Sequence, residues 1–329
     1  MRRIAVIGGG AWGTALAMVA VRAGAKVVLW ARDPAIVAAI RQGHQNPVYL
    51  PGIALDPAIG ATNDLEAALS DAEAALLAVP AQFMRSALGW LKPVLQRTMP
   101  LLVCAKGIET ESLCTMSELA HELVPDCPLA VLSGPSFAGE VASDLPTAVT
   151  IASGEAQLAQ AFMLTLGTSR FRPYRSQDVM GVEIGGAVKN VLAIACGIVE
   201  GRSLGDNARA ALITRGLSEM IALGVAKGAQ AETFRGLSGL GDLVLTCTAG
   251  QSRNYTLGMA LGRGMSLSTA LARRRSVVEG VPTAAAVAQL ASRLGIEMPI
   301  TEAVDAVLHH GATIDMMIDG LLSRPYRSE

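Results

Sequence analysis

A glycine-rich segment stands close to the start of the chain. The spacing GxGxxG is met by Gly8-Gly9-Gly10-Ala11-Trp12-Gly13, which follows an apolar run and opens a segment of helical periodicity. In such a turn Gly8 permits the sharp bend, Gly10 lets a pyrophosphate approach the backbone, and Gly13 lets helix and strand pack closely. The helix N-terminus supplies free N–H donors. The segment therefore predicts dinucleotide binding, and a glycine-rich turn without a ligand is the alternative.

The residues after the second apolar run bear on which dinucleotide would bind. A carboxylate about 20 residues after the glycines ordinarily accepts the ribose 2′-OH of NAD. Here Arg32 comes first and Asp33 next. The Arg32 guanidinium suits a 2′-phosphate, while Asp33 turns away or caps the helix that begins near Pro34. NADP is therefore allowed alongside NAD, and Arg32 as a solvated surface residue is the alternative.

Lysine and serine side chains at three places could act on a small polar substrate. Lys106 follows the apolar run 101–105, and Ser136 lies in the turn after the next run. A turn of this type exposes backbone N–H groups. Lys189, with Asn190 beside it, interrupts an otherwise apolar helical segment. A lysine in such surroundings must extend to solvent, pair with a carboxylate or take part in chemistry.

A polar stretch marked by glycines lies farther along the chain. Residues 239–243 and 247–254 are predicted to form a loop between helices. Ser252, Arg253 and Asn254 offer a hydroxyl, a five-donor guanidinium and an amide in succession at a helix start, which suits a phosphate. Ser252 or Asn254 would equally serve as an ordinary N-cap beside a surface arginine. These residues alone leave both interpretations open.

Two kinds of periodicity predict the elements that position these residues. Up to about residue 175, short apolar runs alternate with helix-period segments, which predicts βαβ units and a parallel sheet. The expected strands are 3–7, 26–30, 74–79, 101–105, 129–132 and 147–152, and the expected helices include 14–23, 34–42 and 112–123. Right-handed crossovers would place the C-terminal end of every strand at one edge, where open α/β sheets bind ligands.

The strand pattern stops near residue 181. Helical segments are expected at 182–199, 208–227, 256–261, 283–294 and 301–309. Gly228, Gly295 and Gly311 stand where helix C-caps would be, and Pro282 and Pro299 stand just before the next starts. The predicted fold is α/β, with a Rossmann-type, doubly wound, mostly parallel sheet in a dinucleotide-binding domain (residues 1–180). An all-α substrate and catalytic domain (residues 181–329) follows it.

The composition of the 329 residues excludes several functional classes. A hydrophobic fraction of 51% is ample for a buried core. With Lys+Arg 27 and Asp+Glu 28 the net charge is −1, so the positive field of a nucleic-acid or polybasic membrane-surface binder is missing. The longest apolar stretches carry charges, Arg22 and Lys26 in one and Glu183 and Lys189 in the other. Neither is expected to span a membrane.

The remaining sequence features concern the compartment and metal ions. The N-terminus lacks the apolar core and cleavage site of a secretory signal. The five cysteines contain no CxxC, which favours reduced thiols in a cytoplasmic protein. The four histidines form no HxxxH and no mixed Cys/His cluster, so no metal site is expected.

Taken together, these segments resemble the bacterial-type NAD(P)-dependent glycerol-3-phosphate dehydrogenases. The likeness covers nearly the whole chain. It rests on GGGAWGTALA at the start, CAKGIE around Lys106, LSGPSFAGE around Ser136, GGAVKNVLAI around Lys189, and then GLGDLVLTCT, GQSRN and VVEG. The resemblance implies interconversion of sn-glycerol 3-phosphate and dihydroxyacetone phosphate by hydride transfer at C2. It also implies a supply of glycerol 3-phosphate for phospholipid synthesis, and a homodimer.

The resemblance further implies roles for individual residues, with Lys189 as the proton acceptor. The implied substrate contacts are Lys106, Gly134, Ser136, Lys189, Asn190, Asp242, Thr246, Ser252, Arg253 and Asn254. The implied cofactor contacts, together with those of the glycine motif, are Gly8, Gly10, Ala11, Trp12, Gly13, Arg32, Lys106, Ala138, Arg253, Val277 and Glu279. Ala11 departs from the many members that carry serine there, so backbone N–H groups would replace a hydroxyl contact to the cofactor phosphates.

The chemistry of Lys189 agrees with this resemblance. The C2 hydroxyl must lose a proton when hydride leaves, and an alkoxide must gain one in the reverse direction; a lysine that reaches this oxygen does both. Burial and a nearby Lys106 would lower its pKa from about 10.4, whereas pairing with Asp242 would raise it. The sequence leaves this balance open.

The sequence leaves two other functions open. A β-hydroxyacid or phosphogluconate dehydrogenase shares the plan of a Rossmann half, a helical half and a catalytic lysine on the first long helix. A catalytically silent subunit that senses NAD(P) is the second, but such a subunit has no need of Lys106, Lys189 and Asp242 together.

Overall fold

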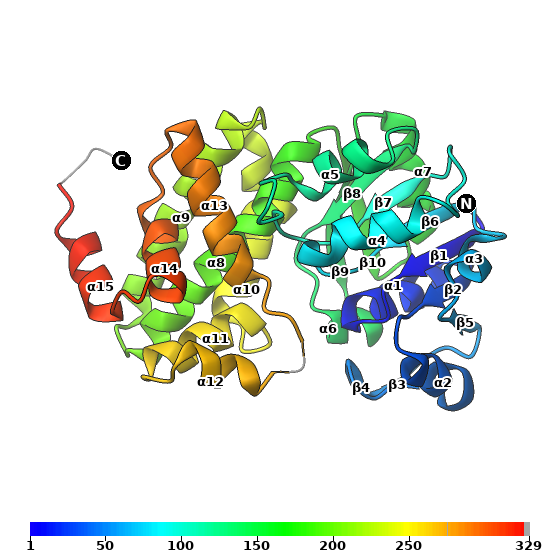
Figure 1. Ribbon diagram of the computed structural model, residues 1–329, viewed down its shortest axis with the longest axis horizontal. Coiled ribbons are helices and arrows are strands. Elements are labelled where there is room, and N and C mark those ends of the chain that lie inside the picture. Colours follow the sequence, from blue (N-terminus) through cyan, green and yellow to red (C-terminus); the bar gives the residue numbers. More distant parts are fainter. Residues whose placement is uncertain (275, 326–329) are drawn as a thin grey trace.

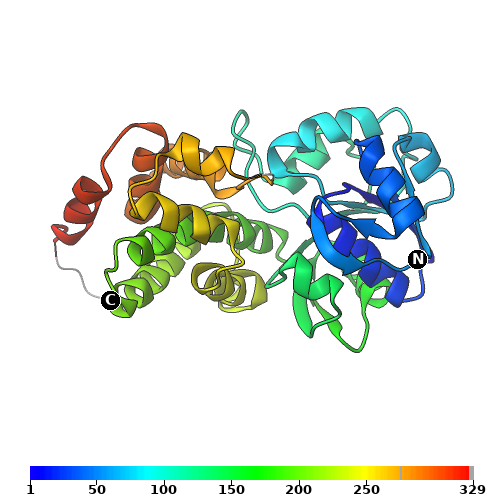
Figure 2. The same cartoon turned by 90° about the horizontal axis from the view of Figure 1, so that it is seen from below.

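The computed structural model describes residues 1–274 and 276–325. Two lobes lie side by side, a sheet lobe that holds the N-terminus and a helical lobe that leads to the C-terminus (Figures 1 and 2). One sheet has the strand order β10-β9-β8-β7-β6-β1-β2-β5. Its strands are β1 (Arg3–Ile7), β2 (Lys26–Trp30), β5 (Ile59–Thr62), β6 (Ala74–Leu77), β7 (Leu101–Val103), β8 (Leu129–Ser133), β9 (Thr147–Ala152) and β10 (Phe171–Ser176).

The sheet is mostly parallel, which confirms the predicted fold class, but it reverses once. Strand β9 pairs antiparallel with β8, and β10 then pairs parallel with β9. The expectation that every strand ends at one edge is therefore wrong for 147–152. The connection from β8 to β9 contains only the five-residue helix α6 (Ala138–Ala142). Such a helix spans about 7.5 Å, which is less than half of what a return along a strand of about 17 Å requires.

Helices cover both faces of the sheet because the strand side chains alternate in direction. On β1, Ile4 and Val6 face one apolar core, and Ala5 and Ile7 face the other. The first core includes side chains of α1 (Ala11–Arg22), α2 (Pro34–Gly43) and α7 (Ala156–Leu166); the second includes those of α3 (Leu65–Leu69), α4 (Met84–Leu91) and α5 (Met116–Leu123). A short hairpin, β3 (Gln45–Asn46) with β4 (Leu50–Ala54), stands apart from the sheet.

Two strands of the main sheet were not predicted. Strand β5 contains Gly60, and β10 has the sequence FRPYRS, so neither is a continuous apolar run. Both are edge strands, which need only one apolar face and tolerate a proline such as Pro173. An apolar-run criterion finds interior parallel strands and misses edges of this kind.

A single long helix forms the centre of the helical lobe. Every residue of α8 (Val179–Gly201) between Gly181 and Val199 is buried, as expected for a helix that is apolar on all sides. In the described part of the chain it is the one helix long and apolar enough to cross a membrane, and its apolar window lies wholly inside the protein. Around it and beyond it are α9 (Asp206–Ala226), α10 (Asp242–Thr248), α11 (Arg253–Gly262), α12 (Leu267–Ala272), α13 (Gly280–Leu294), α14 (Pro299–His309) and α15 (Ile314–Leu322).

The prediction of a loop at residues 239–243 and 247–254 is partly wrong. A five-residue π-helix, η3 (Leu237–Gly241), leads without a break into α10, which carries Asp242 and Thr246 one turn apart. The irregular chain is confined to the few residues before α11. Two glycines and a seven-residue helix give too short a periodic pattern to be recognised in sequence, whereas the buried Leu243 and Cys247 anchor the helix to the core.

Candidate active site

The glycine segment has the geometry of a phosphate-binding turn. Gly8 adopts a φ of +131°, and a Cβ added there would lie 2.7 Å from the Ala78 carbonyl oxygen. A Cβ at Gly13 would collide with the Gly8 carbonyl, so helix α1 packs directly on the turn. A Cβ added at Gly10, by contrast, would meet no other atom within 4 Å. The first N–H groups of α1 have no partner within the helix, so the turn leaves donors and room for an anion.

Arg32 and Asp33, shortly after β2, have different surroundings. The Asp33 carboxylate accepts a hydrogen bond from the Ala35 N–H at 2.9 Å and caps α2. Arg32 is exposed, and its guanidinium has no hydrogen bond or ion pair to residues 1–274 or 276–325. An arginine free at the end of β2 suits the 2′ position of a dinucleotide.

A buried cluster of two lysines and one aspartate joins the lobes. Lys189 Nζ, on α8, donates to Asp242 Oδ1 at 2.5 Å and to Thr246 Oγ1 at 2.9 Å. Lys106 Nζ, beyond β7, donates to Asp242 Oδ2 at 2.7 Å. The Asp242 side chain is 1% exposed and the Lys189 side chain 8% exposed. One carboxylate is thus shared by a lysine from each lobe.

Local backbone packing brings Asp242 to Lys189. A Cβ at Gly185, one turn before Lys189 on α8, would collide with the Ser238 carbonyl of η3. Glycine at 185 therefore lets η3 lie directly on α8, and α10 starts within reach of the lysine. Thr246, one turn into α10, donates its hydroxyl to the Asp242 carbonyl at 2.6 Å. Its oxygen is then oriented to accept from Lys189.

The surroundings of Lys189 and Asp242 shift the pKa values of both side chains. Burial lowers the pKa of Lys189 to about 8, with Asp242 opposing this effect and Lys106 adding to it. Burial by itself would raise the pKa of Asp242, but Lys106 and Lys189 hold it below its ordinary value. The carboxylate is therefore charged at neutral pH, and the Lys189 amine can gain or lose a proton near pH 8.

The turn after β8 lies against the same cluster. Gly134, at a φ of +129°, presents its carbonyl to Lys106 Nζ at 2.8 Å and to the Ser136 hydroxyl at 2.8 Å. Ser136 Oγ is 3.5 Å from Lys106 Nζ. Ala138 begins α6 just beyond. The structure therefore brings Lys106, Gly134 and Ser136 together with Lys189 and Asp242.

The residues at the start of α11 are bonded mainly within the protein. Ser252 is buried and caps α11, accepting from the Tyr255 N–H at 3.2 Å. Asn254 donates to Asn190 Oδ1 at 2.8 Å, and its own Oδ1 accepts from the Gly280 N–H at 2.9 Å. The bonds of Asn254 link α8, α11 and α13. Ser252 is an N-cap, which is the alternative that the sequence left open.

Arg253 differs from its two neighbours. Its side chain is exposed, and Nη1 donates to the Val277 carbonyl at 2.8 Å. Glu279, two residues after Val277, accepts from the Ala81 N–H through Oε1 at 3.2 Å, while Oε2 is buried without a partner among the described residues. Burial raises the pKa of Glu279 to about 7. Arg253 and Glu279 therefore both retain bonding capacity.

Trp12, one of the implied cofactor contacts, donates its indole N–H to the Cys104 carbonyl at 3.1 Å, which joins α1 to the end of β7. Two buried hydroxyl groups near the cluster were given no role from the sequence. Ser133 Oγ and Thr283 Oγ1 are buried with no partner in the parts of the chain that the structure describes. Thr283 lies in an apolar helical pattern, where a small hydroxyl residue gives no signal in sequence.

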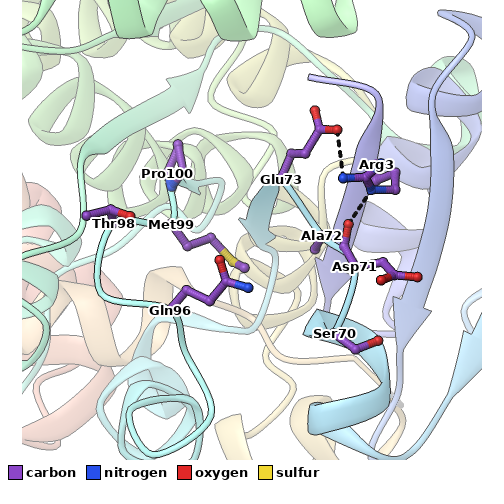
Figure 3. A pocket seen from close by; sticks show the side chains of 9 residues that line it. All are labelled: Arg3, Ser70, Asp71, Ala72, Glu73, Gln96, Thr98, Met99 and Pro100. Atoms are coloured by element: carbon purple, nitrogen blue, oxygen red, sulfur yellow. Dashed lines mark hydrogen bonds and ion pairs between the residues drawn. The ribbon is translucent and has the colours of Figure 1, made fainter.

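A separate cavity lies far from this cluster. It measures about 300 Å³ and is lined by Arg3, Ser70, Asp71, Ala72, Glu73, Gln96, Thr98, Met99 and Pro100 (Figure 3). These residues stand where β1, β6 and β7 begin, at the opposite edge of the sheet from the glycine turn. Arg3 is bonded to the Asp71 carbonyl at 2.5 Å and to Glu73 at 3.2 Å. The guanidinium of this cavity is therefore already paired within the protein.

Comparison with known proteins assigns the family. The family model described as the NAD-dependent glycerol-3-phosphate dehydrogenase N-terminus matches residues 3–159, and the model of the C-terminus matches residues 178–319. The chain belongs to the NAD-dependent glycerol-3-phosphate dehydrogenase family. Because both halves match, the alternative of a β-hydroxyacid or phosphogluconate dehydrogenase is not supported.

Individual glycerol-3-phosphate dehydrogenases resemble the chain over its full length. The enzyme "Glycerol-3-phosphate dehydrogenase [NAD(P)+]" of Rhodospirillum rubrum is 58% identical over 326 residues, which is 99% of this chain and 93% of that protein. The protein of the same name from Parvibaculum lavamentivorans is 53% identical, with 100% and 98% covered. The crystal structure of glycerol-3-phosphate dehydrogenase from Coxiella burnetii is 40% identical, with a TM-score of 0.95 and 98% and 99% covered.

Proposed function

We propose that the protein interconverts sn-glycerol 3-phosphate and dihydroxyacetone phosphate, with NAD(P) as the hydride carrier. The observation that carries this proposal is the buried Lys189–Asp242–Lys106 cluster, which lies where the two lobes of a glycerol-3-phosphate dehydrogenase meet. When bound, the nicotinamide accepts or donates the hydride. The protein supplies binding, orientation and the proton.

Several features of the chain fit the dinucleotide. Gly8, Gly10, Ala11, Trp12 and Gly13 would hold the pyrophosphate, because the space beside Gly10 is open and the first N–H groups of α1 are free. Arg32 would contact the ribose 2′ substituent. Ala138, Val277 and Glu279 would line the nicotinamide end, where the buried Glu279 Oε2 has no partner among the described residues. Both NAD and NADP are compatible with this arrangement.

Lys189 would handle the proton on the substrate C2 oxygen. Two of its N–H groups are committed, one to Asp242 and one to Thr246. In the ammonium form a third N–H remains to donate to the oxygen during reduction, and in the amine form a lone pair remains to accept the proton during oxidation. Asp242 and Thr246 thus orient the reacting nitrogen in both directions.

The phosphate of the substrate needs cations and donors. We assign it to Arg253, Lys106, Ser136 and the turn at Gly134, with Ser252, Asn254 and Asn190 shaping the wall through the bonds between α8, α11 and α13. Arg253 is exposed and keeps donors beyond its bond to Val277. A guanidinium is well suited to a dianion because it offers paired donors in a plane.

The two reaction directions should show opposite pH dependence around pH 8. Reduction of dihydroxyacetone phosphate needs the Lys189 ammonium, so log kcat/KM should be flat below the pKa of about 8 and fall above it. Oxidation of glycerol 3-phosphate needs the amine, so log kcat/KM should rise towards pH 8 and level off above. Initial rates from pH 6 to 10 measure both limbs. The same direction of change in both reactions would contradict the assignment.

Replacement of Arg253 should weaken phosphate binding. In Arg253→Ala the KM for dihydroxyacetone phosphate should rise by about tenfold or more, because a charge-assisted hydrogen bond to a dianion is lost. Steady-state kinetics at saturating cofactor give this value. Arg263→Ala, an exposed arginine at the end of the same helix, is the matched control and should leave KM unchanged. An unaltered KM in Arg253→Ala would remove this residue from the phosphate site.

A direct assay tests the function as a whole. Dihydroxyacetone phosphate is mixed with the purified protein and with NADH or NADPH in parallel, and absorbance at the nicotinamide band is followed. We expect consumption with at least one cofactor, and the ratio of the two kcat/KM values measures the preference between NADH and NADPH. Tight NADPH binding with no turnover would instead support a sensing subunit.

The wider setting is also part of the proposal. We assign residues 1–180 to cofactor binding and residues 181–329 to substrate binding and catalysis, in a cytoplasmic homodimer that supplies glycerol 3-phosphate for phospholipid synthesis. The five cysteines are free thiols, which suits a reducing compartment. Sedimentation and size-exclusion measurements test the homodimer.

A further inference from the structure

The glycine turn is held from outside by a side chain of the β3–β4 hairpin. Asn46, which is 0% exposed, donates through Nδ2 to the Gly9 carbonyl at 2.9 Å and to Thr14 Oγ1 at 2.8 Å. Its Oδ1 accepts from the Tyr49 N–H at 3.2 Å, inside the hairpin turn. All the polar atoms of this buried amide are therefore used.

These bonds fix two successive peptide planes of the turn. Asn46 holds the Gly9 carbonyl, and the Gly10 carbonyl accepts from the Thr14 N–H at 3.0 Å and from the Thr14 hydroxyl at 2.9 Å. In a trans peptide the C=O and the following N–H point in opposite directions. The N–H groups of Gly10 and Ala11 are therefore turned away from Asn46 and Thr14.

The glycines themselves cannot supply this rigidity. Glycine loses more conformational freedom than any other residue when it is fixed, and three of them stand in succession at residues 8–10. A turn that is already ordered before a ligand arrives avoids that cost at the moment of binding. The β3–β4 hairpin places Asn46 against the glycine turn.

We propose that Asn46 is a positioning residue for the pyrophosphate of the cofactor. It acts through Gly9 and Thr14 without touching the dinucleotide, and it presets the Gly10 and Ala11 N–H groups as anion donors. This inference rests on the proposed assignment of the glycine turn to the cofactor. Since NAD and NADP share the pyrophosphate, a change at Asn46 affects both equally, whereas a change at Arg32 affects their ratio.

The main experiment measures cofactor affinity in Asn46→Ala and Thr14→Val. We expect Kd for NADH and for NADPH, from titration calorimetry without substrate, to rise by about tenfold in Asn46→Ala and by less in Thr14→Val. The rise should be the same for both cofactors, and kcat at saturating cofactor should stay within about threefold. Thr14→Val preserves the side-chain shape, so it provides the test if Asn46→Ala does not fold.

Two control variants separate positioning from general stability. Leu50→Ala removes a 3% exposed core side chain from β4 and should lower the unfolding temperature without changing Kd for either cofactor. Gln45→Ala changes the exposed neighbour of Asn46 and should alter neither property. A Kd in Asn46→Ala and Thr14→Val within twofold of the wild type would overturn the proposal. An equal loss of affinity in Leu50→Ala would also overturn it.

A third variant distinguishes this proposal from the one on which it rests. Gly10→Val fills the open space beside the turn and should abolish binding of both cofactors. If Gly10→Val binds normally, the cofactor assignment of the turn fails and the role of Asn46 fails with it. If Gly10→Val does not bind while Asn46→Ala binds normally, only the role of Asn46 is overturned.

Discussion

Lys189→Ala should lower kcat in both reaction directions by a factor of about 10² or more, because positioned acid–base groups typically contribute 10² to 10⁴. The variant loses the Lys189 amine, which can donate and accept a proton near pH 8. The Kd for cofactor should change little, since the glycine turn lies in the other lobe. Steady-state rates and calorimetric titration measure the two quantities.

The proton role of Lys189 can be separated from general damage. Small primary amines added to Lys189→Ala should restore part of the lost rate, because the removed side chain leaves space for them beside Asp242 and Thr246. Lys92→Met, at an exposed lysine after α4, is a control that should keep full activity. Near-normal turnover of Lys189→Ala would exclude this residue from the mechanism.

Asp242→Asn should damage both activity and stability. The substitution leaves two buried or half-buried ammonium groups without their shared counter-charge, and breaking a buried pair typically costs about 3 to 5 kcal/mol. We expect the free energy of unfolding at pH 7, from urea titration, to fall by about 3 kcal/mol. The kcat should fall by a factor of at least about 10², because Lys189 loses its orienting partner.

The pH profile makes the Asp242→Asn test specific. Asp242 raises the pKa of Lys189 against the effects of burial and Lys106. Without it the pKa should fall below 8, so the falling limb of dihydroxyacetone phosphate reduction should move to lower pH. Asp315→Asn, at a largely exposed ion pair with Arg202, should change stability by less than about 1 kcal/mol. An unmoved limb in Asp242→Asn would show that Asp242 does not set the charge of Lys189.

The start of α11 shows what a local sequence pattern can and cannot predict. The sequence identified Ser252, Arg253 and Asn254 as either a phosphate site or a helix start. The structure shows the helix start, with Ser252 as its N-cap, and the phosphate site stays a prediction. Ser252 caps the helix and Asn254 bonds to Asn190 on α8 and to Gly280 on α13, so only Arg253 keeps an exposed donor group. The direction of the Asn254 side chain depends on residues 64 positions earlier and 26 positions later in the chain, which no local sequence pattern reveals.

Neighbouring residues were enough to predict the local features of this protein. Strand-period and helix-period runs predicted β1, β2, β9 and α8 to within a few residues, and the glycine spacing predicted the sharp turn before α1. These features depend on backbone conformation and on which face of an element is apolar. Residues close together in the sequence determine both properties.

Three features could not be predicted from local patterns: the reversal of β9, the pairing of Lys106 and Lys189 with one buried Asp242, and the contact of Asn46 with Gly9. The reversal of β9 follows from the short connection after β8. The two side-chain contacts depend on segments far apart in the chain that packing brings within bonding distance. Once buried there, a polar group must find its partner inside the protein because water is excluded.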